Sequence, residues 1–358
     1  MNRIADKRVA YQKKDTVQMR NDDNRTRKKA LKITIIILCV LLLLLAGLGV
    51  FIWINYEKIT GDLGFDPDHV EEEESIGETG NYPEVTYSGD DVSEMTKSEN
   101  VIDILLIGVD NRDPSKFTGL SDGIMFLRID QKKGTLKLVS VMRDTLVPIE
   151  GHRYNKINAA FNYGGIDLTK KTLKSSLGLS ADYFVVINFY GMEDLIDALG
   201  GVDIKLSSEE VLHMNGSIKE INDIDPDHTA PFVKGAGVRH LTGRQAVAYM
   251  RIRKVGTDTQ RIERQQKVIS ELFSQAKSLG IGQLPGLISA MSRCVRTDIK
   301  PADKMLDIAT TVIGLDVKEI KTYRYPDEYE FGSYKSMDIV QPKDFETEIN
   351  KLHDFLNK

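Results

Sequence analysis

A stretch of 22 residues without a charged side chain, from 33 to 54, sets the first limit on how this chain can fold. As an α-helix rising about 1.5 Å per residue it would be roughly 33 Å long, close to the hydrocarbon thickness of a bilayer. A cleaved signal peptide would have a shorter apolar stretch followed by small residues. This run instead ends near Trp53 and Tyr56, which are typical of membrane interfaces. The sequence therefore predicts a retained transmembrane helix at 33–54.

The charges on the two sides of this run predict its orientation. Residues 1–32 contain 11 Lys and Arg against 4 Asp and Glu, whereas the segment 55–100 is acidic and rich in Gly, Ser and Thr. Positively charged flanks stay on the cytoplasmic side of a membrane. We therefore predict a single-pass protein of the cell membrane, with a basic cytoplasmic tail at 1–32, a loosely ordered stalk at 55–100 and an extracytoplasmic main domain.

The cysteines and the overall charge argue against two classes of protein. Cys39 lies within the predicted membrane helix, so we expect neither a disulfide with Cys294 nor a metal cluster built on cysteines. The whole chain has a net charge of −5, and the part after the basic tail is strongly acidic. We therefore expect no nucleic acid among its partners, because nucleic-acid binding requires a positive surface. Any anion site must come from a local group of cations.

Residues from 101 onward alternate between short apolar runs and helical patterns, which is typical of an α/β domain. The run 101–109 is almost continuously apolar, as expected of a strand buried on both faces of a sheet. A turn at 130–134 predicts that strands 124–129 and 135–142 form a hairpin. We therefore predict a layered α-β-α domain with a mixed central sheet, preceded by the one transmembrane helix.

The other elements follow from hydrophobic periodicity and turn signals. Further strands are predicted at 183–189, 202–206 and 321–325, and residues 249–253 are predicted to be extended. Helices are predicted at 154–163, 168–177, 192–199, 242–248, 258–279, 284–293, 301–313 and 343–356. The segment 207–237 is predicted to be irregular because it is rich in polar residues.

Basic residues cluster where the predicted extended segment meets the helix at 258–279. If residues 249–253 are extended, Arg251 and Arg253 point to the same face. The helix then places three polar residues on one face, Arg261, Arg264 and Gln265. A helix N-terminus and several Arg side chains together favour a phosphate-binding site. The alternative is a solvated basic helix face with ordinary ion pairs, for instance to Glu263.

A charged residue also lies at one end of each of the first three predicted strands. Asp110 ends the strand at 101–109, Asp122 comes just before the next strand, and Arg143 follows the third. Ligands of such sheets collect at the carboxyl ends of strands. The two carboxylates could hold Mg²⁺ against a pyrophosphate or orient Arg side chains. The alternative is that each Asp forms a turn or a cap and that Arg143 makes a surface ion pair.

Two further polar residues, Lys156 and Asn158, lie near the start of a predicted helix and close in sequence to Arg143. The sequence contains no serine-elbow, HExxH or Walker pattern, and its six histidines show no ligand spacing.

Together these motifs resemble the LytR–CpsA–Psr family of bacterial cell-wall proteins over roughly residues 101–275, with 276–358 as the C-terminal part of the same domain. The resemblance rests on the order and spacing of several segments, each of which is weak alone. They are Ile104-Leu-Leu-Ile-Gly-Val-Asp110, Ser121-Asp122, Val139-Ser-Val-Met-Arg143-Asp144-Thr145, Lys156-Ile-Asn158-Ala-Ala-Phe-Asn-Tyr-Gly-Gly165, Gly200-Gly-Val202, Leu241-Thr-Gly-Arg-Gln-Ala-Val-Ala-Tyr249-Met-Arg251-Ile-Arg253 and Arg261-Ile-Glu-Arg264-Gln265-Gln266. One departure is Leu120, where many relatives carry Arg.

The resemblance implies an α-β-α domain with a long apolar groove for a polyprenyl chain. It implies a phosphotransferase that moves a glycopolymer, such as teichoic acid or capsule, from a polyprenyl-pyrophosphate carrier to a peptidoglycan hydroxyl. Asp110 and Asp122 would sit at a centre assisted by Mg²⁺, or by Mn²⁺ in its place. The cations implied to grip the pyrophosphate are Arg143, Arg251, Arg253, Arg261 and Arg264, and we add Gln265, Asn158 and Lys156 as further substrate-binding residues.

The sequence is also compatible with three other functions. A non-catalytic protein could tether lipid-linked polymers, and a pyrophosphatase could use water as the acceptor. A regulatory membrane protein is also compatible with the anchor, although a cytoplasmic tail of 32 residues is too short for a DNA-binding domain.

Overall fold

The computed structural model describes residues 95, 97–109, 111, 116–252, 258–278, 295–300, 302–315, 317 and 320–358. All of them belong to one compact unit, Asn55–Lys358. Within these residues, no helix is both long and apolar enough to cross a bilayer. The predicted tail at 1–32, the membrane helix at 33–54 and nearly all of the stalk at 55–100 lie outside the described residues, as does the helix predicted at 284–293.

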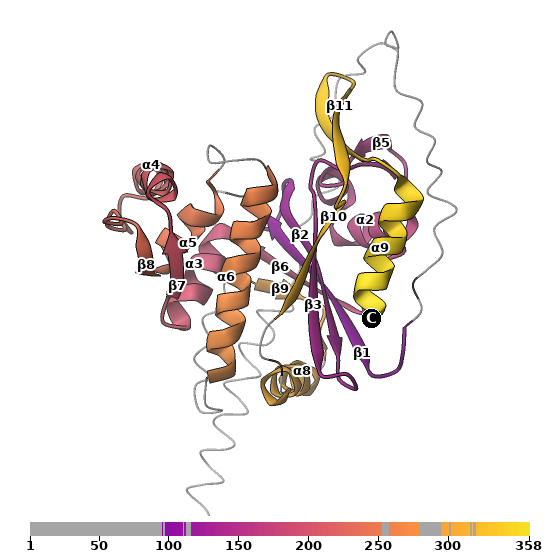
Figure 1. Ribbon diagram of the computed structural model, residues 1–358, viewed down its shortest axis with the longest axis horizontal. Coiled ribbons are helices and arrows are strands. Elements are labelled where there is room, and N and C mark those ends of the chain that lie inside the picture. The colour runs from indigo at the N-terminus through magenta and orange to yellow at the C-terminus, as the bar shows by residue number, and fades with distance from the viewer. Residues whose placement is uncertain are drawn as a thin grey trace, which may run out of the picture. The chain divides into compact units, whose positions relative to one another are not determined.

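A six-stranded mixed sheet forms the centre of this unit, with the strand order β10-β3-β2-β1-β6-β9 (Figure 1). The strands are β1 Val101–Val109, β2 Ser121–Asp130, β3 Thr135–Val141, β6 Tyr183–Asn188, β9 Val295–Thr297 and β10 Lys321–Tyr325. Strand β1 is antiparallel to β2 and parallel to β6, and β2 and β3 form the predicted hairpin. The mixed central sheet of the prediction is therefore confirmed.

Helices cover both faces of the sheet. They are α2 Ala159–Leu177, α3 Phe189–Ala198, α4 Ser208–Ile224, α5 Gly243–Met250, α6 Asp258–Ser278, α8 Ala302–Gly314 and α9 Phe345–Asn357. Three two-stranded sheets complete the fold, formed by β4 Leu146–Ile149 with β5 Arg153–Lys156, β7 Val202–Leu206 with β8 Gly237–Leu241, and β11 Tyr329–Tyr334 with β12 Met337–Pro342.

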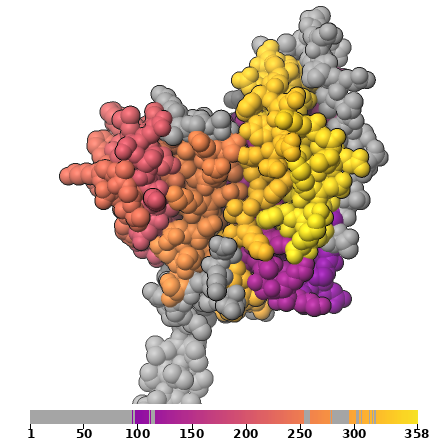
Figure 2. Space-filling model, viewed as in Figure 1, coloured from indigo at the N-terminus to yellow at the C-terminus, as the bar shows by residue number. Residues whose placement is uncertain are grey.

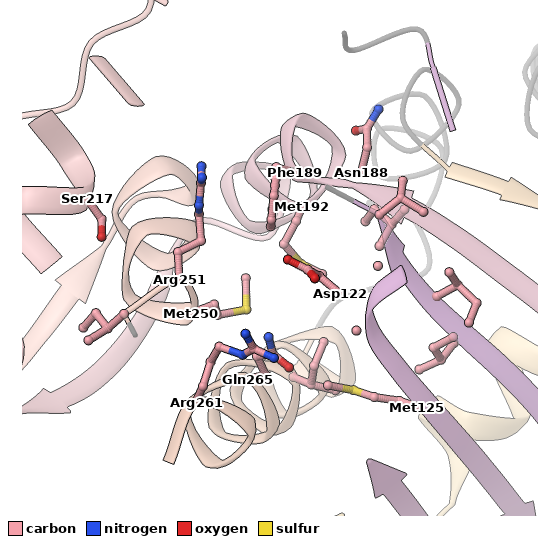
Figure 3. A pocket seen from close by; sticks show the side chains of 18 of the residues that line it. Asp122, Met125, Asn188, Phe189, Met192, Ser217, Met250, Arg251, Arg261 and Gln265 are labelled. Carbon is pink, nitrogen blue, oxygen red and sulfur yellow. The ribbon is translucent and has the colours of Figure 1, made fainter. Parts of the chain in front are cut away.

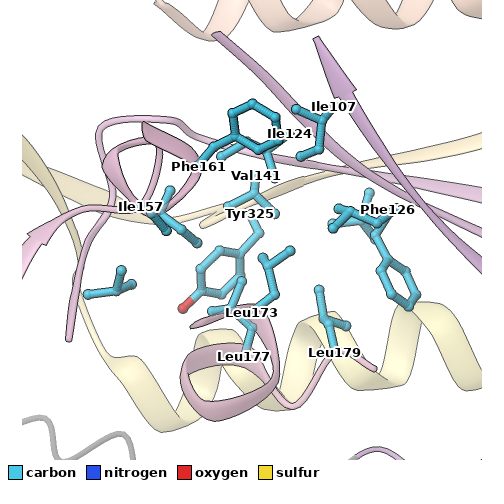
Figure 4. Packing of buried hydrophobic residues seen from close by; sticks show 14 of the residues in the cluster. Ile107, Ile124, Phe126, Val141, Ile157, Phe161, Leu173, Leu177, Leu179 and Tyr325 are labelled. Carbon is cyan, nitrogen blue, oxygen red and sulfur yellow. The ribbon is translucent and has the colours of Figure 1, made fainter. Parts of the chain in front are cut away.

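Side chains alternate along β1, and each face of the strand enters a different core. Leu105 and Ile107 pack on the side of α2 and α9, in the cluster around Tyr325 that Figure 4 shows. Ile102 and Ile104 pack on the opposite side with residues of α6 and α8. This double burial explains why β1 is an almost unbroken apolar run, because a strand needs polar residues only on a face that meets water.

A separate core forms among α3, α4, α5, the β7–β8 hairpin and one side of α6. Helix α4 contributes Val211, Met214, Ile218 and Ile221 to it. The prediction of an irregular segment at 207–237 is therefore wrong for its first half. These apolar residues recur at helical spacing, and Ser207 begins the helix with a capping box to Glu210.

Two further local predictions are wrong. The helix predicted at 154–163 begins only at Ala159, because residues 153–156 pair with β4 instead. Residues 249–251 are not extended, because α5 continues to Met250 and Arg251 caps its end with helical dihedral angles. Within α2, Gly164 and Gly165 leave helical geometry, which confirms the predicted break at this pair.

Candidate functional site

A cavity of about 820 Å³ lies between the sheet and the helices α3 to α6. Strands β1, β2 and β6 form one wall, and residues of α3, α4, α5 and α6 form the others. Most of the lining is apolar, including Leu106, Met125, Val185, Met192 and Ile269. A cavity of this size and lining suits a hydrocarbon chain or another large apolar group.

Two glycines help to leave this space open. Gly108 of β1 and Gly123 of β2 are paired across the strands, and both line the cavity. The pairing register shifts between Gly108 and Val109, at the end of β1. Because neither glycine has a side chain, the wall is recessed where larger residues would project from the sheet.

Four predicted site residues line this cavity together. They are Asp122 from the start of β2, Arg251 from the end of α5, and Arg261 and Gln265 from α6. Figure 3 shows them around the same space, with Arg261 and Gln265 on one helix and Asp122 and Arg251 on two other elements, beside Met250 and Met192. Arg261 is only 5% exposed, and the guanidinium of Arg251 lies 4.8 Å from the centre of the Phe189 ring. The predicted convergence of these residues is therefore seen.

Arg143 joins this group through Asp122. Its Nη1 donates to Asp122 Oδ1 at 2.5 Å, and its Nε lies 3.4 Å from Asp144 Oδ2. The ammonium of Lys156 is 3.0 Å from the other oxygen of Asp144. Asp122 is thus the first member of a chain of alternating charges, which fixes the orientation of its carboxylate.

Asn158 holds the backbone beneath these charges. Its N–H donates to the Arg143 carbonyl at 3.2 Å, and its carbonyl accepts from the Ser121 hydroxyl at 3.3 Å. Its side chain is buried. Asn158 therefore joins the end of β3 to the start of β2, next to the residues that carry the charges. Leu120, the departure from the family pattern, is 48% exposed.

Arg264 lies behind the cavity lining. It is 4% exposed and donates from Nη2 to the Ile252 carbonyl at 2.7 Å. Its burial lowers the pKa of its guanidinium below the usual value. Arg264 therefore holds the chain directly after Arg251 in place. The two other predicted residues, Asp110 and Arg253, lie outside the described residues, so their roles stay predictions.

The sequence did not identify the wall that α4 forms. Leu212, His213, Gly216, Ser217 and Glu220 all line the cavity. They were missed because their segment was expected to be irregular. The signal was present in the apolar spacing of the opposite side of α4, which marks a helix and therefore also defines its other face.

The described residues hold no group of three or more His, Cys, Asp or Glu side chains that could bind a metal ion. Mg²⁺, however, often takes only one or two protein carboxylates and fills its other positions with phosphate oxygens and water. Asp122 is a carboxylate that lines the same cavity as Arg251 and Arg261, two cations that suit a phosphorylated ligand. The donor set described here therefore fits Mg²⁺ only together with a bound phosphate.

A layered α/β domain whose cavity is largely apolar, with two arginines on its lining, has the shape and charge that suit an amphiphile with an anionic head group. More specifically, the chain belongs to the LytR_cpsA_psr family, whose model matches residues 68–353. This assignment confirms the resemblance drawn from the sequence.

Two curated relatives and one solved structure illustrate the similarity. The polyisoprenyl-teichoic acid–peptidoglycan teichoic acid transferase TagT of Bacillus subtilis is 30% identical over 240 residues, covering 65% of this chain and 72% of the relative. The TagU transferase of the same description from Bacillus anthracis is 30% identical over 284 residues, covering 77% and 82%. A structure of TagT bound to LIIa-WTA matches with a TM-score of 0.59 and 25% identity, covering 72% and 90%.

Proposed function

We propose that this protein transfers a glycopolymer of the teichoic acid class from a polyprenyl-pyrophosphate carrier to a peptidoglycan hydroxyl. The observation that carries this proposal is the position of Arg251 and Arg261 on the lining of an otherwise apolar cavity. A lipid pyrophosphate has the matching shape, an apolar chain joined to a compact anion. The printed names of TagT and TagU describe the same donor and acceptor classes for those relatives.

The arrangement explains how each part of the donor is bound. The polyprenyl chain enters the apolar part of the cavity, where burial of each CH₂ group contributes about 0.8 kcal/mol. The pyrophosphate meets Arg251, Arg261 and Gln265. Arg253 would join them if the family resemblance holds at that position. Arg guanidinium groups bind phosphate oxygens with paired hydrogen bonds, so these residues fix both the position and the orientation of the head group.

In the reaction, an acceptor hydroxyl oxygen attacks the phosphorus that carries the glycan. The bond from this phosphorus to the bridging oxygen breaks, and the polyprenyl phosphate leaves. Phosphoryl transfer depends mainly on positioning and on neutralising charge, which the Arg side chains provide. A carboxylate, Asp122 or Asp110, would accept the hydroxyl proton. Asp122, with Asp110, would also hold Mg²⁺ or Mn²⁺, which would add positive charge at the phosphates.

We also propose that the helix at 33–54 anchors the protein in the cell membrane, with the described domain on the extracytoplasmic side. This follows from the uncharged run and its basic N-terminal flank. Both substrates suit that location, because the donor is a membrane lipid and the acceptor is cell wall.

The function is tested with the full-length protein in nanodiscs, a polyprenyl-pyrophosphate glycan, peptidoglycan oligomers and Mg²⁺. Mass spectrometry should detect a phosphodiester-linked glycan on the peptidoglycan. Replacing Arg251 with Ala should reduce the rate by at least about 100-fold, as loss of one charge-stabilising donor commonly does. The control is Arg239→Ala, which removes an exposed guanidinium bonded to backbone carbonyls of its own loop.

The products of this assay distinguish transfer from the two alternative functions, hydrolysis and tethering. Release of free glycan phosphate, with no glycan on peptidoglycan, would contradict transfer and indicate a pyrophosphatase. Tight binding of the donor without any product would indicate a tethering protein. Near-normal transfer by the Arg251→Ala protein would contradict the assigned role of this residue.

A further inference from the structure

The hairpin β11–β12 carries an exposed aromatic side chain that the donor site does not use. Phe331 of β11 is 67% exposed. Tyr329 stands two residues earlier and therefore on the same face of the strand. The two rings meet edge to face, with their centres 5.3 Å apart and their planes at 86°. Together they form a corner with one open aromatic face, which we call the Tyr329–Phe331 corner.

Contacts of Tyr329 show which way this corner is turned. The Tyr329 hydroxyl lies 2.8 Å from the Thr259 hydroxyl in the first turn of α6. The Tyr329 side chain also packs in a cluster with Met142 at the end of β3 and with Ile262 of α6. Ile262 directly follows Arg261, which lines the donor cavity. The corner therefore packs on the first turns of α6, on the helix face next to the one that carries Arg261 and Gln265.

Contacts on both sides of the hairpin hold the corner in place. The guanidinium of Arg324 lies 5.3 Å from the centre of the Tyr329 ring and donates to the carbonyls of Pro326 and Asp327. On the other side of the hairpin, Tyr334 packs in a cluster with Leu146 of β4. The hairpin, yellow in Figure 2, is thus fixed on two sides while Phe331 remains in solvent.

We propose that the Tyr329–Phe331 corner binds the sugar rings of the acceptor glycan. This rests on the proposed function, in which the donor fills the cavity and the acceptor hydroxyl must approach from solvent beside Arg261. Sugar rings present flat arrays of C–H groups, which carry partial positive charge and pack on the negative face of an aromatic ring. An exposed, fixed phenylalanine at the border of the site provides such a face, and binding would remove its apolar surface from water.

The test measures initial transfer rates of the full-length protein in nanodiscs, at saturating donor, while the concentration of soluble uncross-linked peptidoglycan glycan strands is varied. Phe331→Ala should raise the half-saturating acceptor concentration about tenfold, as expected for loss of one aromatic contact. The donor dissociation constant should stay unchanged, and Phe331→Trp should restore acceptor binding. The matched control is Phe232→Ala, which removes another exposed phenylalanine, 54% exposed, far along the chain.

Three results would overturn the proposal. The first is an unchanged half-saturating concentration in Phe331→Ala. The second is a parallel loss of donor binding, which would indicate a structural role. The third is an effect on self-association or on binding to protein-free lipid vesicles instead. If the wild-type protein transfers nothing, titration calorimetry with the same glycan strands tests the corner independently, because glycan binding requires no turnover. Equal affinities of wild type and Phe331→Ala there would overturn it.

Discussion

The guanidinium of Arg264 illustrates how a cation near the donor site can act through the backbone. Its bond to the Ile252 carbonyl fixes the chain next to Arg251. Replacing Arg264 with Met would leave a carbonyl in the interior without this donor, at a cost of about 1–3 kcal/mol. We therefore expect a lower free energy of unfolding in a denaturant titration, and slower transfer.

The control for this substitution is Gln260→Met, on the exposed side of the same helix. The free energy of unfolding of that variant should stay within about 0.5 kcal/mol of the wild type. Undiminished stability of Arg264→Met together with lost pyrophosphate binding would contradict the backbone role. It would instead place Arg264 in direct contact with the ligand, as the family resemblance implied.

At the scale of single elements, the β7–β8 hairpin contains a pH-dependent contact. His240 Nδ1 lies 2.8 Å from Asp203 Oδ1, and Nε2 lies 2.8 Å from the Gly200 carbonyl. Both partners only accept hydrogen bonds when Asp203 is ionised, so the protonated ring satisfies both, and the bond to Asp203 raises the pKa of His240. A raised pKa in the folded state adds stability below the unfolded pKa of about 6.5, and this is lost as pH rises through the folded pKa.

We therefore expect His240→Gln to destabilise the protein more at about pH 6 than at about pH 9. Denaturant titrations of both proteins over this range measure the difference in unfolding free energy. The effect should be small, because the imidazole is largely exposed. An equal difference at both ends of the range would contradict a protonated ring.

Sequence patterns predicted some of the strands and not others. Strands β1, β7 and β10 were predicted to the residue, because apolar runs or alternation bounded by turn residues identify buried strands. Strands β4, β5, β8, β9, β11 and β12 were not predicted. Each is three to six residues long, too short for a clear pattern of its own, so packing against the rest of the fold decides its structure.

Some features of the candidate site could likewise be predicted from the sequence, and others could not. Asp122, Arg261 and Gln265 could be placed together because a strand start and a helix start bring their side chains to one region. Arg251 reaches this region from the end of α5 and not from the extended segment that was predicted. The α4 wall was missed although the spacing of its apolar residues marks a helix, and an apolar groove was expected only from the family resemblance. The wall and the groove both depend on how α4 packs on α3 and α5, which is a property of the tertiary structure.

At the scale of the whole molecule, the proposed function requires a polyprenyl chain between the sheet and α4, with its pyrophosphate at Arg251 and Arg261. Gly216 of α4 allows a direct test. It lines the cavity, and a Cβ atom added there would meet nothing within 4 Å. Gly216→Phe should therefore enter the lipid space without a clash at its Cβ atom, and Gly216→Ala and Lys219→Phe serve as controls.

The decisive measurement compares the dissociation constants of a long polyprenyl pyrophosphate and of inorganic pyrophosphate in these variants. We predict that Gly216→Phe weakens binding of the long-chain lipid by about tenfold or more, because the phenyl ring would exclude roughly two CH₂ groups of the lipid from the cavity. Binding of inorganic pyrophosphate should stay unchanged, and both controls should resemble the wild type. Equal affinity of wild type and Gly216→Phe for the long-chain lipid would contradict the placement of the polyprenyl chain in this cavity.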